Sequence, residues 1–359
     1  KNMGKNKFTI RTLFNIYYLP QWIALPFTLF SSIGFYFSPN PISIFSPFSS
    51  IFPVFIFWHL IWTLISLLKL KSSAFLGLFI IIFTYPQWKA LASFNFSPKE
   101  INAPVIKICT WNVHHWKNLN WTDLKSTESK MGNWILEINP DIICFQEDNL
   151  SSAASKLVKY RFPYGVTGDD KLLTIVSKFP ILQWGSEKYV HSSKGHKEFV
   201  WADIQISEPD GNIDTLRIAN IHLLTTTFDI NNASKKENDI GIDKFFIKSF
   251  QSLNKNAKKR SQQLDQIIKW ETKSTIPVVF AGDFNETPTS NSYLRITSKK
   301  NDSFVKAGRG LGSTFNNLWN IPLRIDWILC PKNMNIISSS TLKQEWSDHN
   351  PLIVEIAPF

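Results

Sequence analysis

The stretch that organises this sequence is Pro277-Val278-Val279-Phe280-Ala281-Gly282-Asp283-Phe284-Asn285. Its β-branched and aromatic start predicts a buried strand that ends at the glycine. Residues two apart in an extended chain point the same way, so Asp283 and Asn285 present a carboxylate and an amide together. Such a pair at a strand end suits a divalent cation and a phosphate, because both groups offer oxygen ligands. The alternative is that the two residues only form a turn after the strand.

Four more predicted strands end in polar residues. The strand ends carry Asn112, Glu147, His222 and the run Ser347-Asp348-His349-Asn350. Asp326 differs because it lies inside an apolar run, where an unpaired charge is costly, so it needs a histidine or a cation as partner. Strands alternating with helices over residues 101–359 predict one α/β domain.

Charge is distributed unevenly along the 359 residues. The net charge is +11, but residues 1–100 hold eight Lys or Arg and one acid, which leaves a net charge of +4 for residues 101–359. The basic balance is therefore no indication of a nucleic-acid surface on the α/β domain. Cys109, Cys144 and Cys330 have neither disulfide nor zinc spacing and are interpreted as small core residues.

The first hundred residues are strongly apolar. No Asp, Glu, Lys or Arg occurs between Arg11 and Lys69. Apolar segments at about 12–37, 50–68 and 72–92 approach the roughly 20 residues that a bilayer requires, and three in series are not a cleaved signal peptide. We therefore expect residues 1–98 to form a membrane anchor of three transmembrane helices. The alternative is a buried helical hairpin in a soluble protein.

Basic residues indicate the orientation of the anchor. Lys1, Lys5, Lys7 and Arg11 precede the first segment, and Lys69 and Lys71 lie between the second and third. The positive-inside rule then places the amino terminus in the cytoplasm and the α/β domain on the outer face.

The strand-end motifs, in their order along the chain, resemble those of the endonuclease/exonuclease/phosphatase (DNase I-like) superfamily. The resemblance covers about residues 101–359 and implies a four-layer α/β/β/α sandwich. The matching motifs are Thr110-Trp111-Asn112, Phe145-Gln146-Glu147, Val176-Ser177-Lys178-Phe179-Pro180-Ile181, Asn220-Ile221-His222-Leu223, Gly282-Asp283-Phe284-Asn285, Arg324-Ile325-Asp326-Trp327-Ile328 and Ser347-Asp348-His349-Asn350-Pro351.

The resemblance implies a role for each motif residue. Mg²⁺ or Mn²⁺ is expected on Glu147, Asn112 and Asp348. Phosphate contacts are expected from Asn112, His222 and Asn285. The catalytic set is expected to be His222, Asp283, Asn285, Asp326 and His349, with Asp283 and His349 both open as the general base. Two features depart from the pattern: His114 stands where some relatives carry an acid or Arg, and residues 225–259 form a long insertion.

The anchor and domain together resemble a bacterial membrane-bound branch that includes teicoplanin-resistance-type proteins. This resemblance implies the bacterial inner membrane, with the domain on its outer (periplasmic) face, and a lipid-linked phosphate such as undecaprenyl pyrophosphate as substrate. Other candidates are a phospholipid or sphingolipid phosphodiesterase, a surface nuclease and a non-enzymatic, membrane-anchored binding module. No feature of the sequence indicates an oligomeric state.

Overall fold

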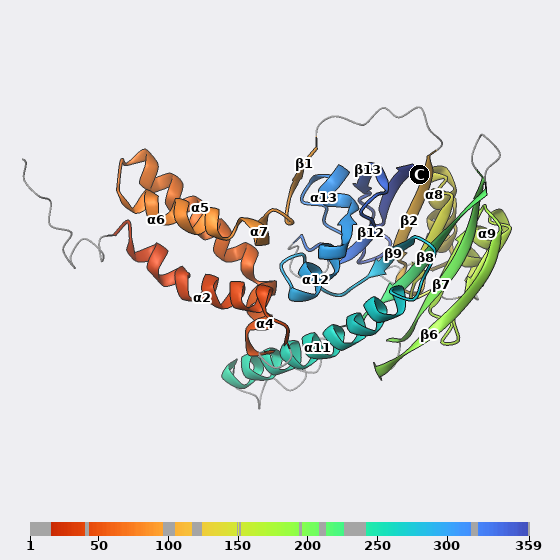
Figure 1. Ribbon diagram of the computed structural model, residues 1–359, viewed down its shortest axis with the longest axis horizontal. Helices are drawn as coiled ribbons and strands as arrows, with labels where there is room; N and C mark the ends of the chain where they lie inside the picture. Colours follow the sequence, from red (N-terminus) through yellow and green to blue (C-terminus); the bar gives the residue numbers. More distant parts are fainter. Residues whose placement is uncertain are drawn as a thin grey trace, which may run out of the picture.

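The computed structural model describes most of the chain. The described residues are 16–39, 43–95, 105–116, 124–148, 150, 152–193, 196–207, 213–225, 242–316 and 322–357. Residues 226–241 of the expected 225–259 insertion lie outside them, and residues 242–259 belong to helix α11, Ile242–Glu271. An elongated group of helices stands to one side of a larger α/β domain (Figure 1).

Two six-stranded mixed sheets form the α/β domain. The first has the order β10 (Lys300–Asp302), β12 (Asp326–Pro331), β9 (Val278–Asp283), β8 (Ile213–His222), β7 (His196–Ser207) and β6 (Ile181–Ser193). The second has the order β13 (Asn335–Thr341), β14 (Leu352–Ala357), β2 (Ile106–Asn112), β3 (Ile142–Gln146), β5 (Leu173–Ser177) and β4 (Tyr164–Thr167). A separate two-stranded sheet pairs β1 (Ser93–Phe94) with β11 (Arg309–Gly310).

Helices cover the outer face of each sheet (Figure 1). Helices α8 (Leu124–Ile138) and α9 (Ala153–Arg161) pack on the second sheet, and α11 and α12 (Asn291–Lys299) pack on the first. The remaining short helices of the domain are η2 (His114–Trp116) and α13 (Ser303–Ala307).

The core consists of three apolar layers. Side chains such as Ile108 and Val279 pack between the two sheets, and a further apolar layer lies under each pair of outer helices. Pro277–Phe280, expected to be a buried strand, forms the start of β9, and Val278, Val279 and Phe280 are buried. The expected α/β sandwich is therefore confirmed. All three cysteines are buried and free, also as expected.

The N-terminal helices have an inverted distribution of polarity. These helices, the "bundle" below, are α2 (Leu19–Tyr36), η1 (Ser43–Phe45), α4 (Ser46–Ser50), α5 (Phe52–Leu68), α6 (Ser73–Phe83) and α7 (Tyr85–Trp88). Its buried polar residues are Gln21, Thr28, Ser31, Ser32, Ser46, Ser49, His59, Thr63, Ser66, Ser73, Thr84 and Gln87. Its exposed large apolar residues include Trp22, Ile23, Phe27, Leu29, Val54, Phe57, Leu60, Ile61, Leu64, Leu67, Phe75, Phe79, Ile82 and Phe83.

Hydrogen bonds hold the polar interior of the bundle together. The Nδ1 atom of His59 lies 2.6 Å from Gln21 Oε1, and its Nε2 atom lies 2.9 Å from the hydroxyl oxygen of Thr28. The Gln87 amide donates to the hydroxyl oxygen of Ser31 at 3.1 Å. His59 is thus a packed, bonded residue of the helix interior.

In the described part of the chain, no helix combines the length and the apolar character needed to cross a membrane. The expected segments 12–37, 50–68 and 72–92 correspond to helices of 18, 17 and 11 residues. Helix α6 ends at Phe83 and α7 starts afresh with Pro86 in its first turn, so the third segment is not one helix. The expectation of three transmembrane helices is therefore unsupported.

Gly282 is required by the pairing of β8 with β9. Its φ angle is +149°, and an added Cβ would lie 1.9 Å from the carbonyl oxygen of Ile221. Strand β8 runs parallel to β9 in a register that sets Ile221 opposite Gly282. Only glycine therefore allows the two strands to approach at the point where the functional residues follow.

We expect Gly282→Ala to lower the free energy of unfolding by more than about 1 kcal/mol, because the backbone must move to relieve the contact. Gly165→Ala is the matched control, since its added Cβ would make an ordinary 3.4 Å contact with Val176. Urea denaturation of both variants measures the difference. Equal stabilities would show that the strand pair tolerates a side chain at 282.

Candidate active site

The topology brings five strand ends to one edge of the sandwich. In the second sheet, Asn112 ends β2 and Glu147 follows the parallel strand β3. In the first sheet, His222 and Asp283 end the parallel strands β8 and β9 and lie opposite each other in register. Asp326 begins the antiparallel strand β12, so it also lies opposite Asp283.

Contacts across the two sheets connect these ends. The amide of Asn112 donates to Glu147 Oε1 at 3.2 Å and to Asp283 Oδ2 at 3.3 Å. His222 Nε2 lies 3.5 Å from Asp283 Oδ2 and 3.9 Å from Glu147 Oε1. The expected residues Asn112, Glu147, His222 and Asp283 therefore form one cluster.

His349 joins two buried carboxylates. Its Nδ1 atom lies 2.9 Å from Asp326 Oδ2, and its Nε2 atom lies 3.7 Å from Asp283 Oδ2. Burial lowers the pKa of His349, but the charges of Asp326 and Asp283 outweigh burial and raise that pKa to about 10. The imidazole is therefore held as a cation between two carboxylates.

The same trio perturbs Asp283. Burial raises the pKa of the Asp283 carboxyl to about 7, the His349 charge opposes the rise, and the Asp326 charge adds to it. A carboxyl group with a pKa near neutrality can exchange a proton at working pH, which is the property of a general base or acid. The pair Asp283 and His349 thus supplies both proton-transfer candidates that the sequence indicates.

Arg324 is not the partner of Asp326. Its Nη1 atom lies 2.8 Å from Asp302 Oδ2, in a buried ion pair that also includes the hydroxyl of Tyr293 at 2.6 Å from the same oxygen. The Asp326 carboxylate instead accepts a hydrogen bond from His349. The backbone N–H of Asp326 donates to the hydroxyl oxygen of Thr314. Asp326, in the apolar strand β12, is thus paired with His349.

Asn285 ties two motif loops together. Its backbone N–H donates to Asp283 Oδ1 at 2.8 Å, and its side-chain amide donates to the carbonyl oxygen of Leu223 at 2.9 Å and to Thr225 at 3.3 Å. The amide nitrogen expected to contact phosphate is therefore directed at the loop after His222. The oxygen Oδ1 is the atom of Asn285 that is left for a ligand.

Four histidine and acidic side chains form the open side of the site. His114 Nδ1 lies 3.7 Å from both Glu147 Oε2 and Asp348 Oδ1, so His114 stands between the two expected metal-binding carboxylates. His115 Nε2 lies 3.7 Å from Glu147 Oε2. Sequence reasoning missed His115, for which the His114-His115 pair directly after a strand was the available signal.

Strained backbone is concentrated here. Of the eight described non-glycine residues with positive φ, five belong to the site or its rim. These five are His114, His115, Trp116, Glu147 and Asn285. Such conformations persist where the surrounding structure imposes them, and they cluster at functional sites.

Oxygen ligands for a metal are present in the right chemical class. Glu147, Asp348 and the amide oxygen of Asn112 are hard donors of the kind that Mg²⁺ and Mn²⁺ prefer. Within the described residues, Asp283, Asp326 and His349 are the group of acidic and histidine side chains whose ligand atoms all lie within 4.8 Å of one another. His349 Nδ1 already bonds Asp326. A metal ion on Glu147, Asn112 and Asp348 stays a prediction.

A buried polar network behind the site joins the two sheets. Gln146 Nε2 donates to Asn220 Oδ1 at 2.7 Å, and Asn220 Nδ2 donates to the carbonyl oxygens of Phe145 and Thr174 at 2.8 and 3.0 Å. The motif residue Asn220 therefore fixes the spacing of the sheets rather than contacting the open side of the site.

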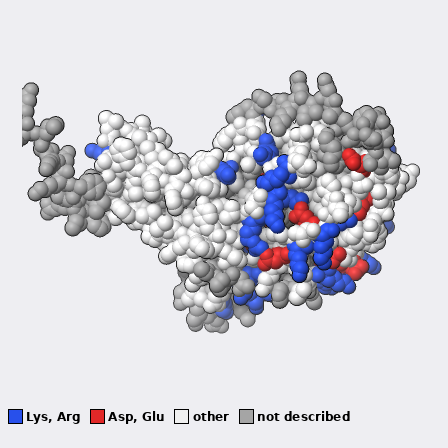
Figure 2. All heavy atoms as spheres, viewed as in Figure 1, with Lys and Arg blue, Asp and Glu red and all other residues white. Residues whose placement is uncertain are grey.

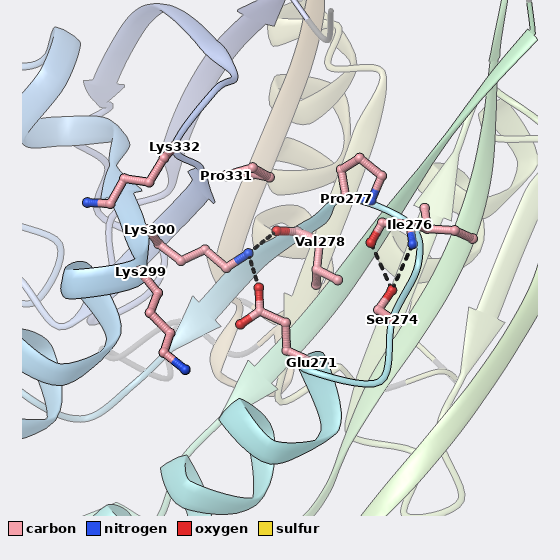
Figure 3. Close-up of a pocket in the computed structure, with 9 residues that line it drawn as sticks. All are labelled: Glu271, Ser274, Ile276, Pro277, Val278, Lys299, Lys300, Pro331 and Lys332. Atoms are coloured by element: carbon pink, nitrogen blue, oxygen red, sulfur yellow. Dashed lines mark hydrogen bonds and ion pairs between the residues drawn. The ribbon is translucent and has the colours of Figure 1, made fainter.

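A separate cleft lies at the other end of β9. It has a volume of about 190 Å³ and is lined by Glu271, Ser274, Ile276, Pro277, Val278, Lys299, Lys300, Pro331 and Lys332 (Figure 3). The ammonium group of Lys300 already bonds Glu271 and the carbonyl oxygen of Val278. None of its lining residues belongs to the strand-end cluster.

Comparison with known proteins identifies the family. Residues 109–349 match the model of the Endonuclease/Exonuclease/phosphatase family. The chain belongs to this family. The matched span includes every residue of the strand-end cluster, so the resemblance drawn from the motifs is confirmed. The family is one of phosphoester hydrolases, and its members typically depend on a divalent metal ion.

Solved structures share the fold. A functionally unknown conserved protein from Enterococcus faecalis V583 and an endonuclease/exonuclease/phosphatase from Bacteroides vulgatus each match with a TM-score of 0.51 and 17% identity, over 71% of this chain and 100% of theirs. A protein of the same description from Beutenbergia cavernae has a TM-score of 0.51 and 14% identity, over 71% of this chain and 72% of its own. No curated protein matches the sequence.

We predict that Asp326 and His349 act as one unit. Asp326→Asn and His349→Ala should each lower turnover on the order of 10²-fold, and the double variant should cost little more than the worse single one, because the carboxylate acts through the imidazole. Turnover per folded molecule and the thermal midpoint are measured for all three. Fully multiplicative losses in turnover would contradict the pairing.

Proposed function

We propose that this protein is a divalent-metal-dependent hydrolase of phosphoric esters or anhydrides. The observation that carries the proposal is the buried Asp283–His349–Asp326 trio beside the oxygen donors of Glu147 and Asn112. Proton-transfer groups and hard metal ligands at one site are the two requirements for hydrolysis at phosphorus.

Each group has a role that fits its surroundings. A bound Mg²⁺ would polarise a phosphoryl oxygen and offset charge on the leaving oxygen. Asp283, with a pKa near 7, accepts the proton of the attacking water. His222 and the imidazolium of His349 face the same carboxylate and stabilise negative charge that develops on the phosphoryl group.

We further propose that the bundle buries its apolar outer surface in a lipid bilayer. In water, an exterior of exposed Trp, Phe, Leu and Ile side chains costs free energy in proportion to its area. In lipid the same exterior is favourable, and hydrogen-bonded polar residues inside a bundle are typical of helices that associate in membranes. Figure 2 shows this uncharged surface beside the charged α/β domain.

Lysines gather next to the uncharged surface. Lys332 has a pKa that is lowered by burial and then by the charges of Lys306 and Lys89, so these three cations stand near one another. In Figure 2 basic side chains gather on this face of the α/β domain, beginning next to the bundle. Such a group suits anionic lipid headgroups at a membrane surface.

A site held at a bilayer favours substrates that are themselves in the bilayer. We therefore propose a lipid-linked phosphate, such as undecaprenyl pyrophosphate, as the substrate. The basic residues before the first apolar segment and between the second and third further support an orientation with the domain on the outer face of a bacterial inner membrane.

The decisive experiment is a substrate panel with Mg²⁺. We expect release of phosphate from a polyprenyl pyrophosphate, in preference to cleavage of sphingomyelin, a phosphoinositide or DNA. Preference for DNA would identify a nuclease.

Glu147→Gln should abolish the activity with an unchanged fold, because it removes a ligand charge from a partly exposed residue that follows a strand and not from the core. Near-native turnover of the variant would refute the assignment of Glu147.

Partition into membranes tests the surface of the bundle. We expect the protein to float with phosphatidylethanolamine/phosphatidylglycerol vesicles in a density gradient. The double variant Phe57→Lys/Leu64→Lys should float less, because a charge inside a bilayer costs about 2.5–3.5 kcal/mol. Val190→Lys is the control, since Val190 is an exposed apolar residue of the α/β domain. Wild-type protein that stays in the aqueous fraction would refute the proposal.

A further inference from the structure

The bundle and the α/β domain meet through the ends of helices. The side-chain amide of Asn291 donates to the carbonyl oxygen of Phe35, at the end of α2, over 2.9 Å. The hydroxyl of Thr289 donates to the carbonyl oxygen of Ser49, at the end of α4. The last carbonyl groups of a helix lack the regular intrahelical partner, and each of these side chains supplies a donor to one of them.

A third link has the same chemistry. Arg324 donates through Nη2 to the carbonyl oxygen of Ala90, two residues beyond α7, over 3.0 Å. Thr289, Asn291 and Arg324 are all buried. Because a buried polar group that loses its partner is destabilising, none of the three links is readily given up.

The donors flank catalytic motifs along the chain. Thr289 belongs to the loop Glu286–Ser290, which follows Asn285, and Asn291 is the first residue after this loop. Arg324 precedes Asp326 by two residues. The loop after Asn285 is thus held on one side by the bundle.

Helix α11 holds the other side of the same loop. Arg260 Nε donates to Glu286 Oε1 at 2.7 Å, and its Nη1 donates to the carbonyl oxygen of Leu224 at 3.1 Å. One side chain therefore connects the loop after Asp283 with the loop after His222. The same helix reaches the bundle, where Phe250 and Phe48 stack edge to face with ring centroids 5.6 Å apart.

We propose that the bundle is the surface that fixes loop 286–291, and that Thr289 and Asn291 are positioning residues for the hydrolysis proposed above. The loop can shift only if its bonds to helices α2 and α4 break. A shift would move Asn285 and the carboxylate of Asp283, to which the Asn285 N–H is bonded. The bundle is then part of the catalytic unit as well as a membrane surface.

The test compares two threonines in the full-length protein. Thr289→Val removes the hydroxyl that bonds Ser49, and Thr289→Ser keeps it. Thr297→Val is the matched control, because the Thr297 hydroxyl bonds the Tyr293 carbonyl within α12 and not the bundle. Hydrolysis of bis(4-nitrophenyl) phosphate with Mg²⁺ is measured, together with hydrogen exchange of the peptide spanning residues 283–289.

We expect Thr289→Val to lower kcat about tenfold or more with little change in KM, because small misplacements of catalytic groups cost rate. The peptide 283–289 should exchange faster in this variant, and Thr289→Ser and Thr297→Val should resemble the wild type. Asn291→Ala should repeat the effect of Thr289→Val.

Unchanged kcat and exchange in Thr289→Val, or the same losses in Thr297→Val, would overturn the positioning role. If wild-type protein hydrolyses none of the substrates tested, the proposed function fails by itself. The exchange rates of the four variants still decide whether the bundle fixes the loop.

Discussion

Two aspartates that face each other on neighbouring strands impose the main constraint on this structure. Asp283 and Asp326 are paired in register between β9 and β12, and both are buried. Two carboxylates in a low-dielectric interior repel each other, so at least one must be protonated or compensated by a cation. His349, which enters from the end of the other sheet, supplies that cation and lies within 3.7 Å of both. The active site therefore requires that the two sheets close on each other.

Side-chain hydrogen bonds between the two sheets, in addition to apolar packing, hold the sheets together. Asn112 reaches from the second sheet to Asp283 in the first, and Asn220 reaches back from the first sheet to the backbone of the second. Each of these amides is buried, and each would leave an unsatisfied partner if the sheets slid apart. Gly282 adds a steric condition, because the parallel strands approach at a point where no Cβ fits. Charge, hydrogen bonding and close approach thus all specify one alignment of the sheets.

Much of this could be predicted from the sequence, because the chemistry lies at strand ends. The β-branched and aromatic residues of stretches such as 278–283 predict buried strands. The ends of these strands lie at one edge of the sheets whatever the conformation of the loops. Side-chain direction could not be predicted: Asn285 aims its amide at Leu223, and His114 and His115 approach Glu147 only because the backbone there adopts positive φ angles. Helix length in the N-terminal part also escaped prediction, since hydropathy does not show where a helix stops and a new one starts.

The form of the contact between bundle and α/β domain follows from the inverted polarity of the bundle. Its outer side chains are apolar and its polar side chains bond each other inside, so they leave few partners for a neighbouring domain. The polar groups that remain available are the backbone carbonyls where helices end. All three described links use these carbonyls, and the donors are side chains of the α/β domain that flank its motifs. If the bundle lies in lipid, as proposed, these helix ends face the domain, and the position of the active site relative to the bilayer is then set by the helices themselves.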